Sequence, residues 1–393
     1  IIKLLNISKM SDSAYFKFLQ DSKSIIDENK NKTVDASLVD NTNDCKILDT
    51  NKKKYLAFVL QKSLEELDEN LLKFENKYCR KGLKINWAVD YDDLLSELHS
   101  IMSKRKVKTA YYTKHYLYEE VGLEDFFKKQ KIKYSESADV NFIEAQTLIA
   151  DTGNLFILDN DMSNFKRLNN GSINIFIIGV EQLISSLADV EAYYNTQLAI
   201  SQKGYNGYIL YHPIKKDKDY LFIVDNGRSN MLNMQRQRVA LNCLHCGRCA
   251  KVCPIYSVIG SEPYNNVFTG PIGNVVLPFF EDVDSYKHVS YACLLCGNCE
   301  KVCPVSIPIK DLIIENRTYF RKTKGIDIPM NSNYLAYKKF VTSRKKMNKS
   351  KILRNMLLNK ILSKAFRKKR KMPPLEKKSF NKQYILSLQN ENK

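Results

Sequence analysis

The chain has 393 residues, 44% of them hydrophobic, which is enough for two or three domains with cores of their own. Its formal net charge of +19 would suit nucleic acid, an acidic protein or an anionic membrane surface. No apolar run approaches the roughly 18 residues that a transmembrane helix needs, so the sequence offers no membrane-spanning segment.

The first 55 residues are polar and rich in Asn, Asp, Lys and Ser, which predicts a loosely ordered arm with one helix near Phe16. From Leu56 to Phe74 apolar residues recur at helical spacing. Strand and helix patterns then alternate. Strands are predicted at "KINWAV", "TAYYTK", "NLFILDN", "INIFIIGV", "YILYHP" and "LFIVDN", and helices at "YDDLLSELHSIMSK", "LYEEVGLEDFFKKQ" and "EQLISSLADVEAYYNTQLAI". This alternation predicts an α/β domain over residues 56–233 with a mainly parallel sheet, closed by an Asn-Gly turn in "DNGRSNML".

Two cysteine runs follow, "CLHCGRCAKVCP" from Cys243 and "CLLCGNCEKVCP" from Cys293. Each has the spacing C-x2-C-x2-C-x3-C-P, which is typical of two-cluster ferredoxins, and in those proteins the fourth cysteine binds the other cluster. The pattern therefore predicts two 4Fe-4S clusters with crossed ligands. Cluster 1 would be held by Cys243, Cys246, Cys249 and Cys303, and cluster 2 by Cys293, Cys296, Cys299 and Cys253.

Two structural zinc sites are the alternative, since zinc also accepts four thiolates. Zinc ribbons, however, use two separated C-x2-C pairs, and the duplicated run with three close cysteines favours iron–sulfur clusters. Clusters serving structure alone remain an alternative to electron transfer. His245 lies between ligands, but its context is not that of a Rieske centre, and we expect it not to bind iron. Clustered cysteines in a large chain also predict a cytoplasmic protein.

The cysteine module is predicted to span residues 234–324. "GPIG" predicts a tight turn leading into a helix, and "IPIKDLIIENRTYFRK" a second helix, so the module is of the α-helical ferredoxin type. Gly247 and Gly297 follow the second cysteine of each run, and we expect them to let backbone N–H groups approach the cluster sulfurs.

Residues 325–393 form a basic tail. Fifteen Lys and Arg lie within residues 338–371, and residues 350–371 combine an apolar stripe with basic positions, which predicts an amphipathic helix. Such a helix suits an acidic partner or an anionic membrane, at which the protein would be peripheral; packing on its own chain is the alternative. Aromatic residues in the tail form no stacking module, so no specific nucleic acid is expected.

The order of "IIGVEQLISSLADVEAYY", "DNGRS", the paired runs and "GPIG" resembles the lactate-utilisation protein B family over roughly residues 56–324. The resemblance implies a LUD domain, similar to the sugar-isomerase and CoA-transferase type of α/β fold. It also implies an iron–sulfur subunit of a cytoplasmic complex that oxidises L-lactate to pyruvate. The implied partners are a second iron–sulfur subunit and a small LUD-only subunit. At residues 137–139 the chain lacks a stretch of the family's LUD domain, so we expect an abbreviated domain, and the resemblance does not establish a substrate pocket.

Catalytic residues stay unknown at this stage. Lys114, Glu119 and Glu120 either face a pocket or form a charged helix start. "DTGN" at residues 151–154 is a functional loop or a plain turn, and Arg228 pairs with an acid at the domain junction or serves the turn.

Two functions therefore compete: electron transfer in lactate oxidation, acting as an oxidoreductase subunit only with partners, and an iron–sulfur scaffold of another redox complex with no substrate site of its own. No G-x-G-x-x-G or P-loop pattern occurs, which disfavours a nucleotide cofactor of those types.

Overall fold

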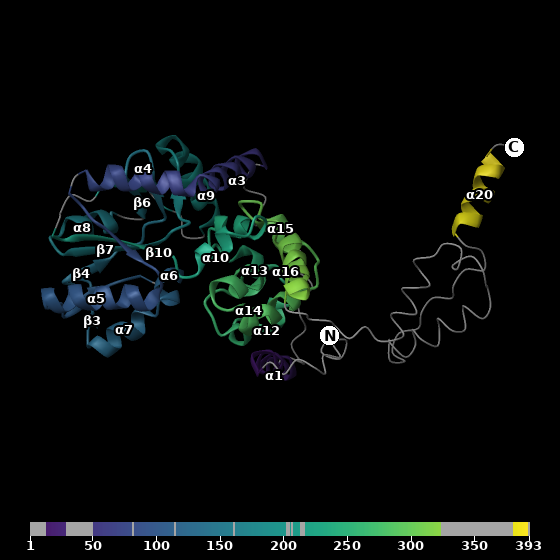
Figure 1. Ribbon diagram of the computed structural model, residues 1–393, viewed down its shortest axis with the longest axis horizontal. Helices are drawn as coiled ribbons and strands as arrows, with labels where there is room; N and C mark the ends of the chain where they lie inside the picture. The colour runs from purple at the N-terminus through teal and green to yellow at the C-terminus, as the bar shows by residue number, and fades with distance from the viewer. Residues whose placement is uncertain are drawn as a thin grey trace. The chain divides into compact units, whose positions relative to one another are not determined.

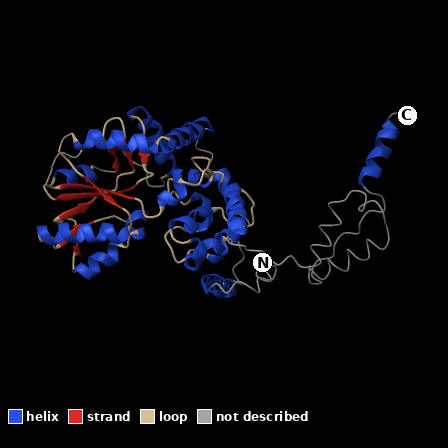
Figure 2. Cartoon of the chain, viewed as in Figure 1, coloured by secondary structure: helices blue, strands red, loops and turns tan. Residues whose placement is uncertain are grey.

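The structure is a computed structural model that describes residues 13–28, 50–80, 82–113, 115–159, 162–201, 205, 207–212, 217–323 and 380–391. One compact unit spans Met10–Lys324. Its described strands all lie between residues 85 and 224, and the described residues that follow are helical apart from their loops (Figure 2).

The main sheet has six parallel strands in the order β1-β10-β7-β4-β2-β3. They are β1 (Ile85–Ala88), β2 (Thr109–Tyr111), β3 (Lys133–Tyr134), β4 (Val140–Phe142), β7 (Ile173–Gly179) and β10 (Asp219–Val224). The near-continuous apolar runs of β7 and β10 are explained by their central place, where both faces are covered. One face packs against α5 (Tyr91–Arg105), α6 (Tyr116–Glu120) and α7 (Leu123–Gln130), as Figure 1 shows. The prediction of an α/β domain with a parallel sheet is confirmed.

A second, mixed sheet has the order β8-β5-β6-β9. Its strands are β5 (Thr147–Ile149), β6 (Asn154–Asp159), β8 (Leu183–Ile184) and β9 (Gly207–Tyr211). Only β5 and β8 run parallel, and the other two pairs are antiparallel. Around this sheet, α3 (Thr50–Glu65) and α4 (Leu67–Cys79) pack against β8, and α8 (Ser163–Asn169) packs against β6. "NLFILDN" and "YILYHP" therefore belong to this separate sheet, which the sequence did not reveal.

The long helix predicted over residues 181–200 was wrong in its first half. Leu183–Ile184 is strand β8, paired with β5, and a short 3-10 helix, η2 (Leu187–Asp189), follows. The side chain of Ser186 accepts a hydrogen bond from the Ala188 backbone N–H and begins that turn. Only α9 (Val190–Ile200) is a regular helix. The apolar residues Leu183 and Ile184 fit either helical periodicity or a short buried strand, and pairing with β5 decides the outcome.

The second half of the compact unit is helical, as predicted for the cysteine module. Its elements are α10 (Arg228–Leu232), η3 (Gln237–Asn242), α11 (Arg248–Lys251), α12 (Tyr256–Ile259), η4 (Glu262–Tyr264), α13 (Gly270–Phe280), α14 (Val283–Tyr286), η5 (Lys287–Tyr291), α15 (Asn298–Val302) and α16 (Ile309–Thr323). The "GPIG" helix, α13, is the centre of this half, because α10, α11, α14 and α16 all pack against it.

Part of the polar N-terminal arm is ordered against this half. The predicted helix near Phe16 is α1 (Ser13–Glu28), and Phe18 is buried against the rings of Tyr264 and His288. The arm is therefore not wholly loose. Apolar contact fixes α1, in which seven of the sixteen residues are apolar.

Of the tail, the structure describes α20 (Phe380–Glu391), in which Tyr384, Ile385, Leu386 and Leu388 are exposed. The amphipathic helix predicted for residues 350–371 lies outside the described residues. No helix among the described residues is long and apolar enough to cross a membrane.

The junction between the α/β half and the helical half is a buried ion cluster. The Arg228 side chain is fully buried, and its two terminal nitrogens donate to the Glu120 carboxylate at 2.9 Å each. Its Nε lies 2.7 Å from Glu181 Oε2, and its guanidinium carbon lies 5.0 Å from the centre of the Phe280 ring in α13. Burial alone would lower the pKa of Arg228, but Glu181 and Glu120 outweigh it and raise that pKa. Of the two uses expected for Arg228, pairing with an acid at the junction is the one observed.

Replacing Arg228 with Met should destabilise the protein by about 3–5 kcal/mol, because Glu120 and Glu181 would stay buried without their cation. Arg236→Met is the matched control. Arg236 pairs with Glu315 at the surface, and its loss should cost less than about 1 kcal/mol. Chemical unfolding of both variants measures the difference, and equal costs would contradict a junction held by Arg228.

Gly227 gives a second test of the junction. Its φ of +84° favours glycine, and an added Cβ would lie 2.4 Å from the Phe280 carbonyl oxygen. Gly171 has the same φ of +84° but open space around it. Gly171→Ala should cost about 1–2 kcal/mol from backbone strain alone. Gly227→Ala should cost about 1–3 kcal/mol more, because α13 must move away. Equal unfolding midpoints for Gly227→Ala and Gly171→Ala would show that α13 can move away from residue 227 at little cost.

Candidate functional site

The two cysteine runs fold into loops of the same conformation. His245 and Leu295, at equivalent positions, have φ of +50° and +58°, and Gly247 and Gly297 have φ of +69° and +76°. In both loops the residue two after the first cysteine donates its N–H to that cysteine's Sγ, at 3.4 Å for Cys243 and 3.3 Å for Cys293. The sequence duplication is thus also a structural duplication.

Gly247 and Gly297 adopt a left-handed backbone conformation, and their expected role beside the cluster sulfurs stays a prediction. A Cβ at Gly247 would meet no atom within 4 Å, and one at Gly297 would make only ordinary contacts with Glu300 and Lys310. Within the protein, their left-handed backbone conformation, not a close approach, requires glycine. That conformation is what turns the chain back after the second cysteine of each run.

Each fourth cysteine also accepts a backbone N–H, although the donor lies three residues later in the first run and four later in the second. Cys253 Sγ accepts the Tyr256 N–H at 3.4 Å, and Cys303 Sγ accepts the Ile307 N–H at 3.3 Å. Backbone N–H groups that point at sulfur stabilise a thiolate and tune the potential of a cluster bound to it. This donor arrangement fits an iron–sulfur group in both halves of the module.

The electrostatics of the thiols divide them into two sets. Burial is the largest cause of the raised pKa of Cys243, and Cys246, Cys249 and Cys303 raise it further. Burial also raises the pKa of Cys253, and Cys293 and Cys296 raise it further. The pKa of Cys299 is raised to about 12, mainly by burial and further by Cys293, Cys253 and Cys296. Thiols gathered this closely resist ionisation unless a positive metal lies among them.

A cavity of about 340 Å³ lies where the first set meets. Its lining includes Cys243, Cys246, Cys249 and Cys303, with apolar residues such as Phe268 and Ile272. The same four cysteines were assigned to cluster 1 from the sequence, so this cavity supports that assignment. The interaction of Cys249 with Cys299 indicates that the two sets lie next to each other.

Two structural zinc sites were the alternative for these cysteines. Among the described residues no group of three or more His, Cys, Asp or Glu side chains is gathered closely enough to hold one ion. Zinc requires its sulfur ligands at about 2.3 Å from one point. A four-iron cluster places an iron between each thiolate and the common centre, so its ligands stay farther apart.

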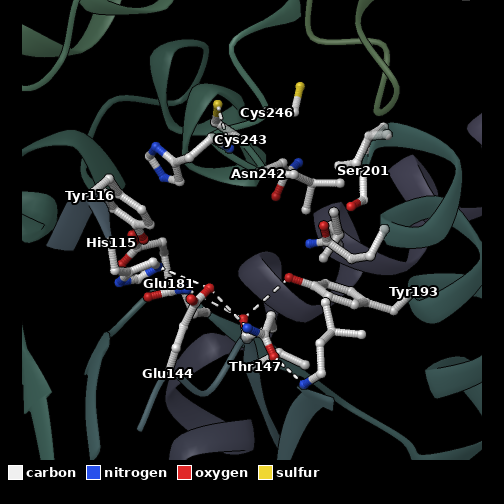
Figure 3. A pocket seen from close by; sticks show the side chains of 18 of the residues that line it. His115, Tyr116, Glu144, Thr147, Glu181, Tyr193, Ser201, Asn242, Cys243 and Cys246 are labelled. Carbon is white, nitrogen blue, oxygen red and sulfur yellow. Dashed lines mark hydrogen bonds and ion pairs between the residues drawn. The ribbon is translucent and has the colours of Figure 1, made fainter. Parts of the chain in front are cut away.

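A second cavity of about 340 Å³ lies between the α/β half and the first cysteine loop. Cys243, His245 and Cys246 line one side, and Glu144, Glu181 and Tyr193 are among the residues that line the rest. Figure 3 shows Cys243 and Cys246 together above the cavity and His115, Glu144 and Glu181 gathered on one wall. Its volume lies within the range of small-molecule sites in proteins.

The polar residues of that wall come from the carboxyl ends of adjacent parallel strands. His115 follows β2, Glu144 follows β4 and Glu181 follows β7; Arg228, behind the wall, follows β10. These four strands are neighbours in the main sheet, in the order β10-β7-β4-β2. The carboxyl edge of a parallel sheet is where α/β proteins bind ligands.

Contacts among these side chains fix the wall. His115 Nε2 lies 3.3 Å from Glu144 Oε1, which also accepts a hydrogen bond from Gln146 at 2.8 Å. Burial lowers the pKa of His115 despite the opposing effect of Glu144. The Tyr116 ring stacks on His245, with 3.6 Å between ring centres, and so links α6 to the cysteine loop. His245 thus has a packing role and remains a predicted non-ligand.

The weaker candidates from the sequence lie elsewhere. Glu119 is exposed, Glu120 is buried on Arg228, and neither is among the residues that line this cavity, while Lys114 lies outside the described residues. Residues 151–154 form the turn between β5 and β6, where Asp151 accepts hydrogen bonds from Ser186 and Leu187. The plain-turn interpretation of "DTGN" fits these contacts.

The sequence analysis missed His115, Glu144 and Glu181. A signal was present for two of them, because each is a polar residue shortly after a buried strand. Strand β4, however, has only three residues, and Glu181 was placed at the start of a predicted helix. Without strand order, nothing in the sequence indicated that these residues meet.

Comparisons with known proteins divide the chain in the same way. The family model of the LUD domain matches residues 68–235, and that of the 4Fe-4S dicluster domain matches residues 239–307. A crystal structure of a DUF162 family protein from Deinococcus radiodurans covers 40% of this chain and 98% of its own, at 12% identity. Its TM-score of 0.27 is too low to support an argument.

Two curated relatives are named lactate utilization protein B. The one from Oceanobacillus iheyensis is 33% identical over 190 residues, which are 46% of this chain and 40% of that protein. The one from Bacillus thuringiensis is 28% identical over 208 residues, or 51% and 44% of the two chains. The matches thus span less than half the length of these relatives. The chain combines a LUD domain with a 4Fe-4S dicluster domain, and in this combination it is similar to lactate utilization protein B, as its motifs predicted.

Proposed function

We propose that this protein is an iron–sulfur electron-transfer subunit of a cytoplasmic complex that oxidises L-lactate to pyruvate. It would bind two 4Fe-4S clusters, one on each of the cysteine sets described above. The observation that carries this proposal is the cavity lined by Cys303 together with Cys243, Cys246 and Cys249 of the first run. Clusters bound in this way lie close enough in the chain to exchange electrons, and the names of the relatives supply lactate as the substrate.

The clusters' surroundings suggest a direction for the electron path. Cys243 is half-buried and lines the cavity next to the α/β half, whereas Cys296 and nearby Leu294 are exposed. Arg317 donates to the Cys293 carbonyl at 2.8 Å and leaves a cation near that edge. Cluster 2 is therefore the one that a partner subunit would reach. We propose a second iron–sulfur subunit and a small LUD-only subunit as partners, in line with the family resemblance.

The alternative is an iron–sulfur scaffold of another redox complex, without a substrate site of its own. The cavity between the LUD domain and Cys243 weighs against it, because a scaffold has no need of a polar space beside a cluster. The LUD boundary at residues 56–233, the module at 234–324 and the role of the basic tail on an acidic partner or membrane surface remain proposals.

Cys253→Ser should remove the cluster held by the second run. The protein purified without oxygen should fall from about eight iron atoms per chain to about four, since one four-iron cluster remains. Its reduced electron paramagnetic resonance (EPR) spectrum should match that of Cys296→Ser, and the spectrum of Cys303→Ser should match that of Cys246→Ser. If each run binds its own cluster, Cys253→Ser will instead match Cys246→Ser. Stoichiometric zinc without sulfide would exclude the clusters altogether.

Lactate should reduce the clusters only in the assembled complex. The full chain is purified anaerobically with the products of its neighbouring genes, and L-lactate is added while the broad visible absorbance of the clusters is followed. We expect bleaching with L-lactate and none with the chain alone. An assembled complex with intact clusters that L-lactate fails to bleach, but another reductant bleaches, would contradict lactate as the electron source.

A further inference from the structure

We propose that the cavity bounded by Glu144, Tyr193 and Cys243 binds an uncharged quinone head group, which exchanges electrons with cluster 1. The inference rests on the proposed electron-transfer function and adds the chemical class of the molecule that meets the buried cluster. Figure 3 shows the cavity with the sulfur atoms of Cys243 and Cys246 at one end and the His115–Glu144 pair at another.

The charge of the wall argues against an organic anion. Among the described residues that line the cavity, the charged ones are Glu144 and Glu181, and there is no Lys or Arg. Arg228 lies behind Glu181 and is fully engaged by two carboxylates. A carboxylate such as lactate would therefore enter without a counter-charge and against two negative groups, which is costly in a partly buried site. An uncharged molecule avoids that cost.

The other lining groups suit an uncharged molecule that carries oxygen atoms. Neutral hydrogen-bonding side chains surround the space, including Gln182, Gln197 and Tyr193, and apolar ones such as Leu60 and Leu183 lie between them. Small-molecule sites commonly combine apolar surface with a few polar groups in this way. Carbonyl oxygens would accept from the amides, and a flat ring would pack on the apolar side chains.

The neighbouring cluster narrows the class further. A 4Fe-4S cluster passes electrons singly, so the molecule that reacts with it directly must be stable after gaining one electron. A simple alcohol or keto acid is not, whereas a quinone is. Among uncharged, oxygen-bearing compounds, quinones therefore satisfy both conditions: they bring no negative charge to the acidic wall, and they accept single electrons from a 4Fe-4S cluster.

The reaction balances as follows. Cluster 1, held by Cys243, Cys246, Cys249 and Cys303, would supply the two electrons that a quinone takes one after the other, and the partner subunit would be their source. Each carbonyl oxygen gains one proton, giving the hydroquinone, and no other bond forms or breaks. Glu144 and His115, with Oε1 and Nε2 3.3 Å apart, form the titratable pair on the wall through which a proton can pass from solvent.

Binding is tested with the full chain, its clusters oxidised, and menadione as the probe, by calorimetry. Gln197 of α9 lines the cavity, and Leu198, next to it, is exposed and outside the lining. Gln197→Trp should fill the space and weaken binding about tenfold or more, while the matched control Leu198→Trp should bind as the unchanged chain does. Equal binding by both variants, or no binding by the unchanged chain, would overturn the proposal.

The same titration with L-lactate tests the charge argument. Lys203 lies outside the described residues, so the titration with L-lactate also tests whether a cation from residues 202–204 binds an anion in the cavity. L-lactate should not displace menadione. Direct binding of L-lactate that Gln197→Trp abolishes and Leu198→Trp keeps would show that the cavity takes an organic anion, and would overturn the uncharged class.

A second readout needs no variant. The spectrum of Cys246→Ser identifies which EPR signal belongs to cluster 1. Menadiol, which cannot oxidise the reduced clusters, should shift that signal and leave the signal of cluster 2 unchanged. An unshifted cluster 1 signal at saturating menadiol would overturn the location.

The proton step is tested with Glu144→Gln, which should slow oxidation of the reduced clusters by bound menadione about 10²-fold in stopped flow. An unchanged rate per bound menadione would remove Glu144 from the proton path.

These outcomes separate the inference from the proposed function. Menadione binding is measured on this chain without partners or lactate, whereas lactate-dependent bleaching needs the complex. Binding without bleaching would keep the cavity and reject the lactate complex. Bleaching without binding would keep the complex and reject the cavity.

Discussion

The structure depends on one buried guanidinium. Arg228 joins Glu120, at the end of α6, to Glu181, after β7, and its ring contact with Phe280 joins both to the central helix of the cysteine module. A single cation thus fixes where the carboxyl edge of the LUD sheet meets the cluster-binding half. Burial raises the pKa of Glu181, the Arg228 guanidinium opposes that rise, and the Glu181 carboxyl group also lines the cavity. The same group therefore sets both the junction and the polarity of the space beside it.

The cysteine half illustrates how much a short sequence pattern can determine. Spacing predicted the ligands, and the structure adds a reason for the spacing: left-handed residues at His245 and Leu295 bring an N–H onto the first sulfur of each run. That conformation is rare for residues with a Cβ, and here the rest of the loop enforces it twice. In each cysteine run, the same backbone conformation therefore shapes the loop and positions the sulfur ligands.

Prediction from the sequence succeeded where the signal was local and failed where it was not. The central strands β7 and β10, the helix α5 and the "GPIG" helix follow from apolar runs, an Asp90 cap and a glycine turn, all readable within a dozen residues. The mixed sheet, the break of the 181–200 helix and the meeting of His115 with Glu144 depend on which strands are neighbours. Strand order depends on the whole chain, so it could not be predicted from the sequence close to Glu144.

The docking of α1 has a consequence for how the protein is made. Tyr264 and His288, which cover Phe18, are synthesised more than two hundred residues after it. At ribosomal rates of about 5–20 residues per second, α1 waits on the order of tens of seconds for its binding surface. During that interval the nascent chain displays an uncovered apolar helix while the LUD domain folds behind it. The contact that holds α1 can therefore form only after the cysteine module has been synthesised.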